Sequence, residues 1–186
     1  MRLFVLAICF LLLPSGNLFA KMVHDIDLPE TVTIAGESLQ LNGYGLRKKY
    51  FFKIYLGSLY TREKATTTEQ VLAMPGPKLI RMDFIHKKVD REKITQAFAS
   101  GFANNSPQLI DDPKLEQFLN LFNSDFVAGD QVDIELAADG TVRVRKNSES
   151  LGEINSTSLV EAVLLVYLGD SPADTDLKKG LLGANQ

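Results

Sequence analysis

The sequence is poor in the residues that supply thiol and imidazole chemistry. It has one cysteine, Cys9, and two histidines, His24 and His86. A single cysteine excludes an internal disulfide framework. The histidines lie far apart among polar neighbours, which is typical of surface residues. The chain also lacks a metal-ligand cluster, a phosphate-binding glycine loop and a nucleophile motif, and it shows no basic face for nucleic acid. We therefore expect no metal, no cofactor and no nucleic-acid partner.

Residues 1–20 have the pattern of a secretory signal peptide. Arg2 supplies a short positive region, Leu3–Leu13 is apolar, and Ala20 suits the last position before cleavage. The apolar run is short for a bilayer span, although an uncleaved anchor remains an alternative. Cleavage would remove the cysteine and would change the formal charge from −3 to −4 by removing Arg2. Export without disulfides favours a bacterial periplasm, and residues 21–186 suffice for one domain with no membrane span.

Hydrophobic periodicity and turn signals divide the rest of the chain into strands and helices. We expect Lys21–Glu30 to be a loosely tied leader. The predicted strands are Thr31–Ile34, Leu39–Arg47, Tyr50–Tyr60, Lys78–Ile85, Val132–Leu136, Thr141–Arg145 and Glu149–Asn155. The predicted helices are Thr67–Met74, Asp90–Asn105, one that opens at Asp112-Pro113, Leu159–Leu168, and a last one that starts at Ser171-Pro172. This order predicts an α+β fold in which helices pack on one face of a largely antiparallel sheet.

Local signals support particular boundaries. Thr67 with Gln70, and Ser158 with Glu161, are each spaced as a capping box at a helix start. Asp139-Gly140 is a strong hairpin signal between two alternating runs. The helix that follows Ser158 is apolar almost all round, which is typical of a helix buried on every side.

The most informative segment is the hairpin made by the second and third predicted strands. Gly43 and Gly45 would weaken a strand unless a ligand or another backbone must come close. If Lys48-Lys49 forms a two-residue turn, Arg47 pairs with Tyr50. Tyr55 then lies about 16 Å further along its strand. Arg47 and Tyr55 would converge only through a bulge, a bend or a longer turn.

An arginine and a tyrosine that did converge beside an aromatic wall would suit an acid. The pair would hold a carboxylate or phenolate head, and Phe51, Phe52 and Ile54 would line the space for an apolar body. The alternative is that Arg47 is a solvated turn residue and Tyr55 a core tyrosine.

The run GYGLRKKYFFKIYLGSLY resembles the first large hairpin of the chalcone isomerase-like superfamily, which shows a Gly-x-Gly-x-Arg element followed by an aromatic-rich strand. Further matches follow in the same order across Leu28–Gly183. They are Lys78-Leu79-Ile80-Arg81, the helix Asp90–Asn105, Leu164–Gly169, and Asp176-Leu177-Lys178-Lys179-Gly180-Leu181-Leu182. The resemblance implies an open-faced β-sandwich. It is that of a bacterial exported member, nearer the fatty-acid-binding branch than the catalytic enzymes.

The resemblance transfers the site residues one by one. Arg47 matches the arginine of the plant enzymes, and Tyr55 falls where a strand threonine serves the reaction. Lys93 and Ser100 stand where a tyrosine and an asparagine would be, and Val166 replaces a late-helix hydroxyl. The resemblance thus implies no efficient chalcone cyclisation. In the fatty-acid-binding branch an arginine and a strand tyrosine hold the carboxylate. We therefore expect Arg47, Tyr55, Lys93 and Ser100 to be ligand-binding residues.

Three functions remain open on this basis. The first is a non-catalytic periplasmic binder of a small apolar carboxylic acid, such as a fatty acid or a lipid-like ligand. The second is an isomerase or lyase of unknown substrate that uses Arg47, Tyr55 and Lys93. The third is a periplasmic interaction protein that binds no ligand. A closed apolar cavity reached by Arg47, as opposed to a solid core, would separate the first from the third, whereas the second needs a titratable group inside that cavity.

Overall fold

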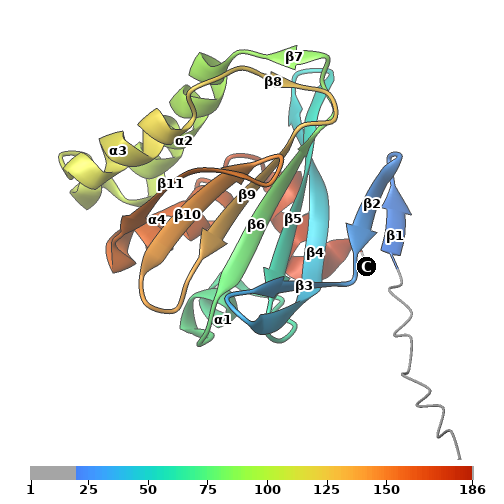
Figure 1. Cartoon of the computed structure of the whole chain (residues 1–186), viewed down its shortest axis with the longest axis horizontal. Helices are drawn as coiled ribbons and strands as arrows, with labels where there is room; N and C mark the ends of the chain where they lie inside the picture. Colours follow the sequence, from blue (N-terminus) through green and yellow to red (C-terminus); the bar gives the residue numbers. More distant parts are fainter. Residues whose placement is uncertain (1–19, 186) are drawn as a thin grey trace, which may run out of the picture.

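The computed structural model describes residues 20–185, which are built around one antiparallel sheet of seven strands. Helices pack on one face of this sheet (Figure 1), which confirms the predicted α+β class. From one edge to the other, the strands are β11 (Glu149–Asn155), β10 (Thr141–Lys146), β9 (Gln131–Leu136), β6 (Lys78–Phe84), β5 (Phe52–Thr61), β4 (Glu37–Lys49) and β3 (Thr31–Ile34).

Two small sheets and the helices complete the fold. The small sheets pair β1 (Ala20–Val23) with β2 (Ile26–Pro29) and β7 (Lys88–Val89) with β8 (Phe126–Val127). The helices are α1 (Thr68–Ala73), α2 (Arg91–Asn105), α3 (Pro113–Leu121), α4 (Thr157–Leu168) and α5 (Thr175–Lys179), with the short turns η1 (Pro107–Leu109) and η2 (Gly180–Ala184). Within residues 20–185, no helix has the length and apolar character needed to cross a membrane.

The main core lies between the sheet and the helices, and α4 is its most buried helix. Most side chains of α4 are enclosed, as its apolar sequence predicts. An aromatic cluster joins α2 to α3, because the ring of Phe98 lies 5.2 Å from that of Phe118 and 5.1 Å from that of Phe122. This packing fixes α2 above the sheet.

The start of α4 differs from the prediction. The capping residue is Ser156, whose hydroxyl accepts the N–H of Leu159 at 3.2 Å, and Ser158 lies inside the helix. Both serines can cap, but the N–H of Ser156 donates to the carbonyl of Gly140. That bond keeps Ser156 in the extended conformation that an N-cap needs. The capping box at Thr67 and Gln70 is confirmed.

The opposite face of the sheet carries a second, smaller core. Leu56 and Tyr60 point to this face because they alternate along β5 with Tyr55 and Leu59, which point to the helices. The hairpin of β1 and β2 covers this face and buries Leu28 completely. The expectation of a loosely tied leader at Lys21–Glu30 is therefore wrong, because Leu28 anchors it.

The β4–β5 hairpin turns two residues later than predicted. The turn residues are Tyr50 and Phe51, because Lys49 pairs with Phe52. Tyr50 has the left-handed φ of 54° that such a tight turn requires. The register shifts at a bulge next to Arg47, so Arg47 pairs directly with Tyr55. The predicted turn at Lys48-Lys49 is wrong. The later turn moves the partner of Arg47 from Tyr50 to the neighbourhood of Tyr55, and the bulge shifts the register by the last residue.

The C-terminal helix packs against the glycines of β4. A Cβ atom on Gly43 would lie 2.6 Å from the carbonyl oxygen of Leu181, and one on Gly45 would lie 3.0 Å from the Cα of Leu177. Gly43 and Gly45 thus allow the close approach of a helix rather than of a ligand. The helix α5 itself begins after Asp174, so the predicted start at Ser171-Pro172 is wrong. Those residues form the loop that leads into it.

Candidate functional site

Arg47 lies on the helix-covered face of the sheet, next to the bulge that Ile54 forms in β5. Its side chain is 17% exposed. The Nη1 atom donates to the carbonyl of Lys48 at 3.0 Å and lies 3.5 Å from Oδ2 of Asp174. Arg47 is therefore a partly buried cation with a fixed position rather than a solvated turn residue.

Asp174 holds Arg47 in place and was not identified from the sequence. Its Oδ1 accepts the N–H groups of Asp176 and Leu177 at 2.9 and 3.0 Å, which caps α5. Its Oδ2 accepts the N–H of Lys48 at 3.0 Å and faces Arg47. One carboxylate thus ties the start of α5 to the end of β4. In the sequence, Asp174 is recognisable only as a capping residue directly before the helix. Its partners on β4 are too remote in the chain to be inferred.

Tyr55 stands opposite Arg47 on β5 and is buried. Burial raises the pKa of its phenol from 10.0 to about 12, although the nearby Arg47 guanidinium and a hydrogen bond from Tyr167 favour the ionised form. Tyr55 therefore stays protonated at neutral pH. A neutral phenol beside an arginine is a hydrogen-bond donor for a carboxylate head group.

Tyr167 on α4 is a second buried phenol that the sequence reasoning missed. Its single hydroxyl proton can point either to the sulfur of Met82 at 3.2 Å or to the Tyr55 phenol, which is also within hydrogen-bonding reach. Burial, followed by the neighbouring Tyr55, raises the pKa of Tyr167 well above its usual range. The sequence does mark this position, because Tyr167 is the one residue with a hydroxyl group in the apolar run Leu159–Leu168. The resemblance instead indicates the adjacent Val166 as the site position on this helix.

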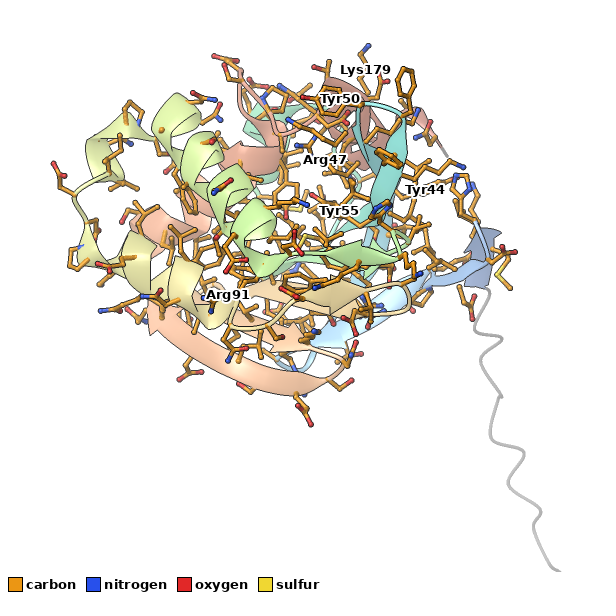
Figure 2. The ribbon with its side chains drawn as sticks, turned by 90° about the horizontal axis from the view of Figure 1, so that it is seen from above. Tyr44, Arg47, Tyr50, Tyr55, Arg91 and Lys179 are labelled. Atoms are coloured by element: carbon orange, nitrogen blue, oxygen red, sulfur yellow. The ribbon has the colours of Figure 1, made fainter. Side chains whose placement is uncertain are left out.

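These side chains line a cleft of about 420 Å³ between the sheet, α2 and α4. Such a volume lies within the roughly 300–1,000 Å³ typical of small-molecule sites. Figure 2 shows Arg47 and Tyr55 close to each other beside α2. The lining comprises Arg47, Lys49, Ile54, Tyr55, Met82, Val89, Lys93, Ile94, Gln96, Ala97, Phe98, Ser100, Gly101, Asn104, Val166, Tyr167, Ser171, Pro172 and Ala173. The structure thus brings all four predicted site residues to one cleft.

The four residues do not lie at the same depth. Arg47 and Tyr55 are on the sheet, whereas Lys93 and Ser100 are exposed on α2 at the rim. The Lys93 side chain is 70% exposed and its Nζ lies 2.8 Å from Oδ2 of Asp90. That contact lowers the pKa of the Asp90 carboxyl. Lys93 is therefore a paired surface cation and not a buried amine.

The expected aromatic wall is only partly present. Ile54 lines the cleft, but Phe51 is fully exposed and Phe52 is 57% exposed. The expectation that these two phenylalanines form the wall is wrong because the turn falls at Tyr50-Phe51, which places them at the end of the hairpin. Their place in the cleft is taken by residues of α2, among them Ile94 and Phe98.

Metal chemistry has no support in the described part of the chain. Within residues 20–185, no group of three or more His, Cys, Asp or Glu side chains could hold a metal ion. His24 is exposed, and the ring of His86 packs edge-on against Phe52 at 5.2 Å. The cleft offers arginine and lysine cations, two neutral phenols, and a lining of apolar and neutral polar side chains.

Comparison with known proteins identifies the family. No curated protein matches the sequence. A solved structure of a fatty-acid binding protein from Arabidopsis thaliana has the same fold, with a TM-score of 0.63 and 17% identity over 82% of this chain and 96% of that chain. The family model described as chalcone isomerase-like matches residues 20–183, nearly the whole described chain. The chain therefore belongs to the chalcone isomerase-like family.

Proposed function

We propose that this protein is a non-catalytic binder of a small apolar carboxylic acid, such as a fatty acid, in the bacterial periplasm. The observation that carries the proposal is the cleft reached by Arg47, which is partly open to solvent rather than the closed cavity expected, but which leaves space for a ligand beside the core. The shared fold with a plant fatty-acid binding protein supports it. The periplasmic location rests on the sequence of residues 1–20, most of which lie outside the described residues.

Arg47 is suited to orient an acid head group. A guanidinium has five N–H donors, and both the Lys48 and the Asp174 contacts are made by Nη1. One further donor faces the Tyr55 phenol, and the remaining N–H groups are left for a ligand carboxylate. A hydrogen bond to a charged group contributes about 1.5–3 kcal/mol net.

The apolar part of the ligand would provide most of the affinity. Each methylene that leaves water contributes about 0.8 kcal/mol. A tail of several methylenes between the sheet and α2 therefore outweighs the head-group bond. Arg47 would set orientation and the preference for an acid, and the tail would set strength.

The protonation states in the cleft favour binding over proton transfer. A general base works best with a pKa near the operating pH, but burial raises that of Tyr55 to about 12. Tyr167 is shifted in the same direction, and Lys93 is paired with Asp90 at the surface. Val166 supplies no hydroxyl to the cleft. These features suit a site that holds an acid without transforming it.

The test is calorimetric titration of delipidated protein with straight-chain acids of graded length. Affinity should rise about fourfold for each added methylene until the cleft is full. Ala97→Trp, which fills the cleft, should abolish binding of the longer acids. Ala99→Trp places the same side chain on the exposed side of α2 and should leave binding unchanged. Absence of binding at every length, or equal loss in both variants, would contradict the proposal.

A further inference from the structure

The end of the β4–β5 hairpin exposes three consecutive aromatic side chains. Tyr50 is 82% exposed, Phe51 is 100% exposed and Phe52 is 57% exposed. Figure 2 shows Tyr50 at the outer end of the molecule, beyond Arg47 and Tyr55. The backbone is constrained here, since Tyr50 has a left-handed φ. The aromatic tip, as we call Tyr50–Phe52, is therefore a projecting turn and not an extension of the core.

The aromatic tip is surrounded by positive charge. Lys48, Lys49 and Lys53 flank it and are exposed. None of the three forms an ion pair with a carboxylate of residues 20–185. The ring contact between Phe52 and His86 brings the exposed Lys87 close as well. The whole chain has a formal charge of −3. The lysines around the aromatic tip therefore form a local positive region on a protein whose net charge is negative.

We propose that the aromatic tip is a docking surface for an anionic lipid bilayer. Aromatic side chains partition to the membrane–water interface, and each nearby lysine is attracted to an anionic leaflet. A protein partner fits less well. Three aromatic side chains bury at most roughly 450–750 Å², whereas a stable interface takes about 800 Å² from each partner. A bilayer requires no such area, because lipid accommodates a narrow projecting turn.

Docking would set the orientation of the cleft. Arg47, Lys49 and Ile54 line the cleft and belong to the same two strands as the aromatic tip. The cleft rim would therefore lie beside the lipid headgroups. That the docked protein exchanges its ligand with the bilayer rests on the proposed function, whereas the docking itself does not.

The test is flotation of the protein with lipid vesicles, using the form that the cell exports. Wild type should bind vesicles of mixed phosphatidylglycerol and phosphatidylcholine, and salt should weaken this binding. Vesicles of phosphatidylcholine alone should bind much less. Phe51→Ser should weaken binding roughly tenfold, and the pair Lys48→Gln with Lys53→Gln should weaken it roughly thirtyfold.

Two substitutions away from the tip serve as controls. Ile110 is another exposed apolar residue, at 56%, and Lys114 is a half-buried lysine at the start of α3 whose Nζ donates to the carbonyl of Asn155. Ile110→Ser and Lys114→Gln should leave vesicle binding unchanged. Every protein compared has the same N-terminus, so any contribution from residues before Lys21 is equal.

The outcomes separate the two proposals. Arg47→Ala should weaken acid binding by roughly ten- to a hundredfold but keep vesicle binding, because Arg47 lies behind the tip. Phe51→Ser should weaken vesicle binding but keep acid binding. Equal binding of wild type and Phe51→Ser to anionic vesicles would overturn the docking proposal. So would dimerisation that depends on Phe51 in the absence of any vesicle binding, since a second copy would then be the partner.

Discussion

Tyr55 and Tyr60 belong to one strand, but their hydroxyls have different surroundings. Tyr55 faces the cleft, with Arg47 and Tyr167 beside its phenol. Tyr60 faces the other side of the sheet, where the residue is completely buried. Its hydroxyl has that of Ser58 nearby, but neither hydroxyl forms a hydrogen bond of good geometry within residues 20–185. A buried polar group without a partner costs stability, so Tyr60 is a weak point of the second core.

We predict that Tyr60→Phe raises the free energy of unfolding by about 1 kcal/mol at neutral pH. The substitution removes the desolvated hydroxyl and keeps the ring, including its contact with the Arg81 guanidinium at 5.7 Å. Urea denaturation measures the change. Tyr55→Phe is the matched control and should instead lose about 0.5–1.5 kcal/mol, because its hydroxyl has partners. A loss of stability in Tyr60→Phe would show that the hydroxyl is satisfied.

The same substitution should change the alkaline limb of stability. Burial raises the pKa of Tyr60 from 10.0 to about 12. Below pH 10.0 the Tyr60 phenol is protonated in both the folded and the unfolded chain, and the stability linked to its raised pKa is fully present. Between these values the unfolded chain releases the proton while the folded chain keeps it, so stability falls as pH rises. Tyr60→Phe should therefore show a shallower decline above pH 10.0, with the decline due to Tyr55 still present.

Residue identities in the site were predictable only where the chemistry is local. Arg47 stands out as a cation after a glycine run, and Tyr55 as a polar ring in an apolar strand. Asp174 and Tyr167 could not be assigned, because their roles depend on contacts with Lys48 and Met82 in distant strands. The roles of Asp174 and Tyr167 follow from burial and from neighbouring charges that only the folded chain brings together.

At the scale of elements, the packing of the C-terminal helix on β4 determines the shape of the site. The backbone of residues 180–183 passes so close to Gly43 that there is no space for a side chain on that residue. The same approach brings Asp174 to Arg47. The glycines thus serve the cleft indirectly, by letting the helix that carries this carboxylate reach the strand.

We predict that Gly43→Ala lowers the free energy of unfolding by about 3 kcal/mol, at the upper end of overpacking costs. The new Cβ would lie 2.6 Å from the carbonyl oxygen of Leu181 and 2.8 Å from the N of Gly183, and these backbone atoms cannot rotate away. Urea denaturation measures the loss. Gly129→Ala is the control, since Gly129 has open space and a φ of +93°. It should lose about 1–2 kcal/mol from backbone strain alone, and an equal loss in both variants would contradict the packing account.

The observed boundaries of helices and strands agree with the predicted ones where a local sequence signal determines them. The hairpin at Asp139-Gly140 and the capped start of α1 are confirmed. The bulge opposite Arg47 was not predicted, because the bulged strand carries no glycine at Lys53–Tyr55 to mark it. The start of α5 was missed for a different reason. Ser171-Pro172 is a plausible helix start by sequence, but Asp174 is the residue whose side chain caps the helix.

At the scale of the whole molecule, the described fold begins where the predicted signal peptide ends. Residues 1–19 lie outside the described residues. Cleavage after Ala20 would leave Lys21, which pairs with Leu28 in the β1–β2 hairpin. Export would therefore leave this hairpin and its buried Leu28 in place.

We predict that the exported protein begins at or near Lys21. N-terminal sequencing of protein from its own cells measures this directly. Leu12→Arg places a charge in the apolar run, which should block export and leave the precursor uncleaved. An exported protein that retains Met1 would show that the segment is an anchor rather than a signal peptide.

The central claim is that Arg47 recognises the acid group of a ligand held in the cleft, and one calorimetric comparison tests it. Wild type and Arg47→Ala are each titrated with a fatty acid and with its methyl ester, which has the same tail and no charge. Wild type should prefer the acid by roughly ten- to a hundredfold, the equivalent of a charge-assisted hydrogen bond, and Arg47→Ala should lose that preference while it still binds the ester. Arg62→Ala, at an exposed arginine paired with Glu37, should behave as wild type. The claim is contradicted if wild type binds acid and ester equally well, or if Arg47→Ala keeps the full preference for the acid.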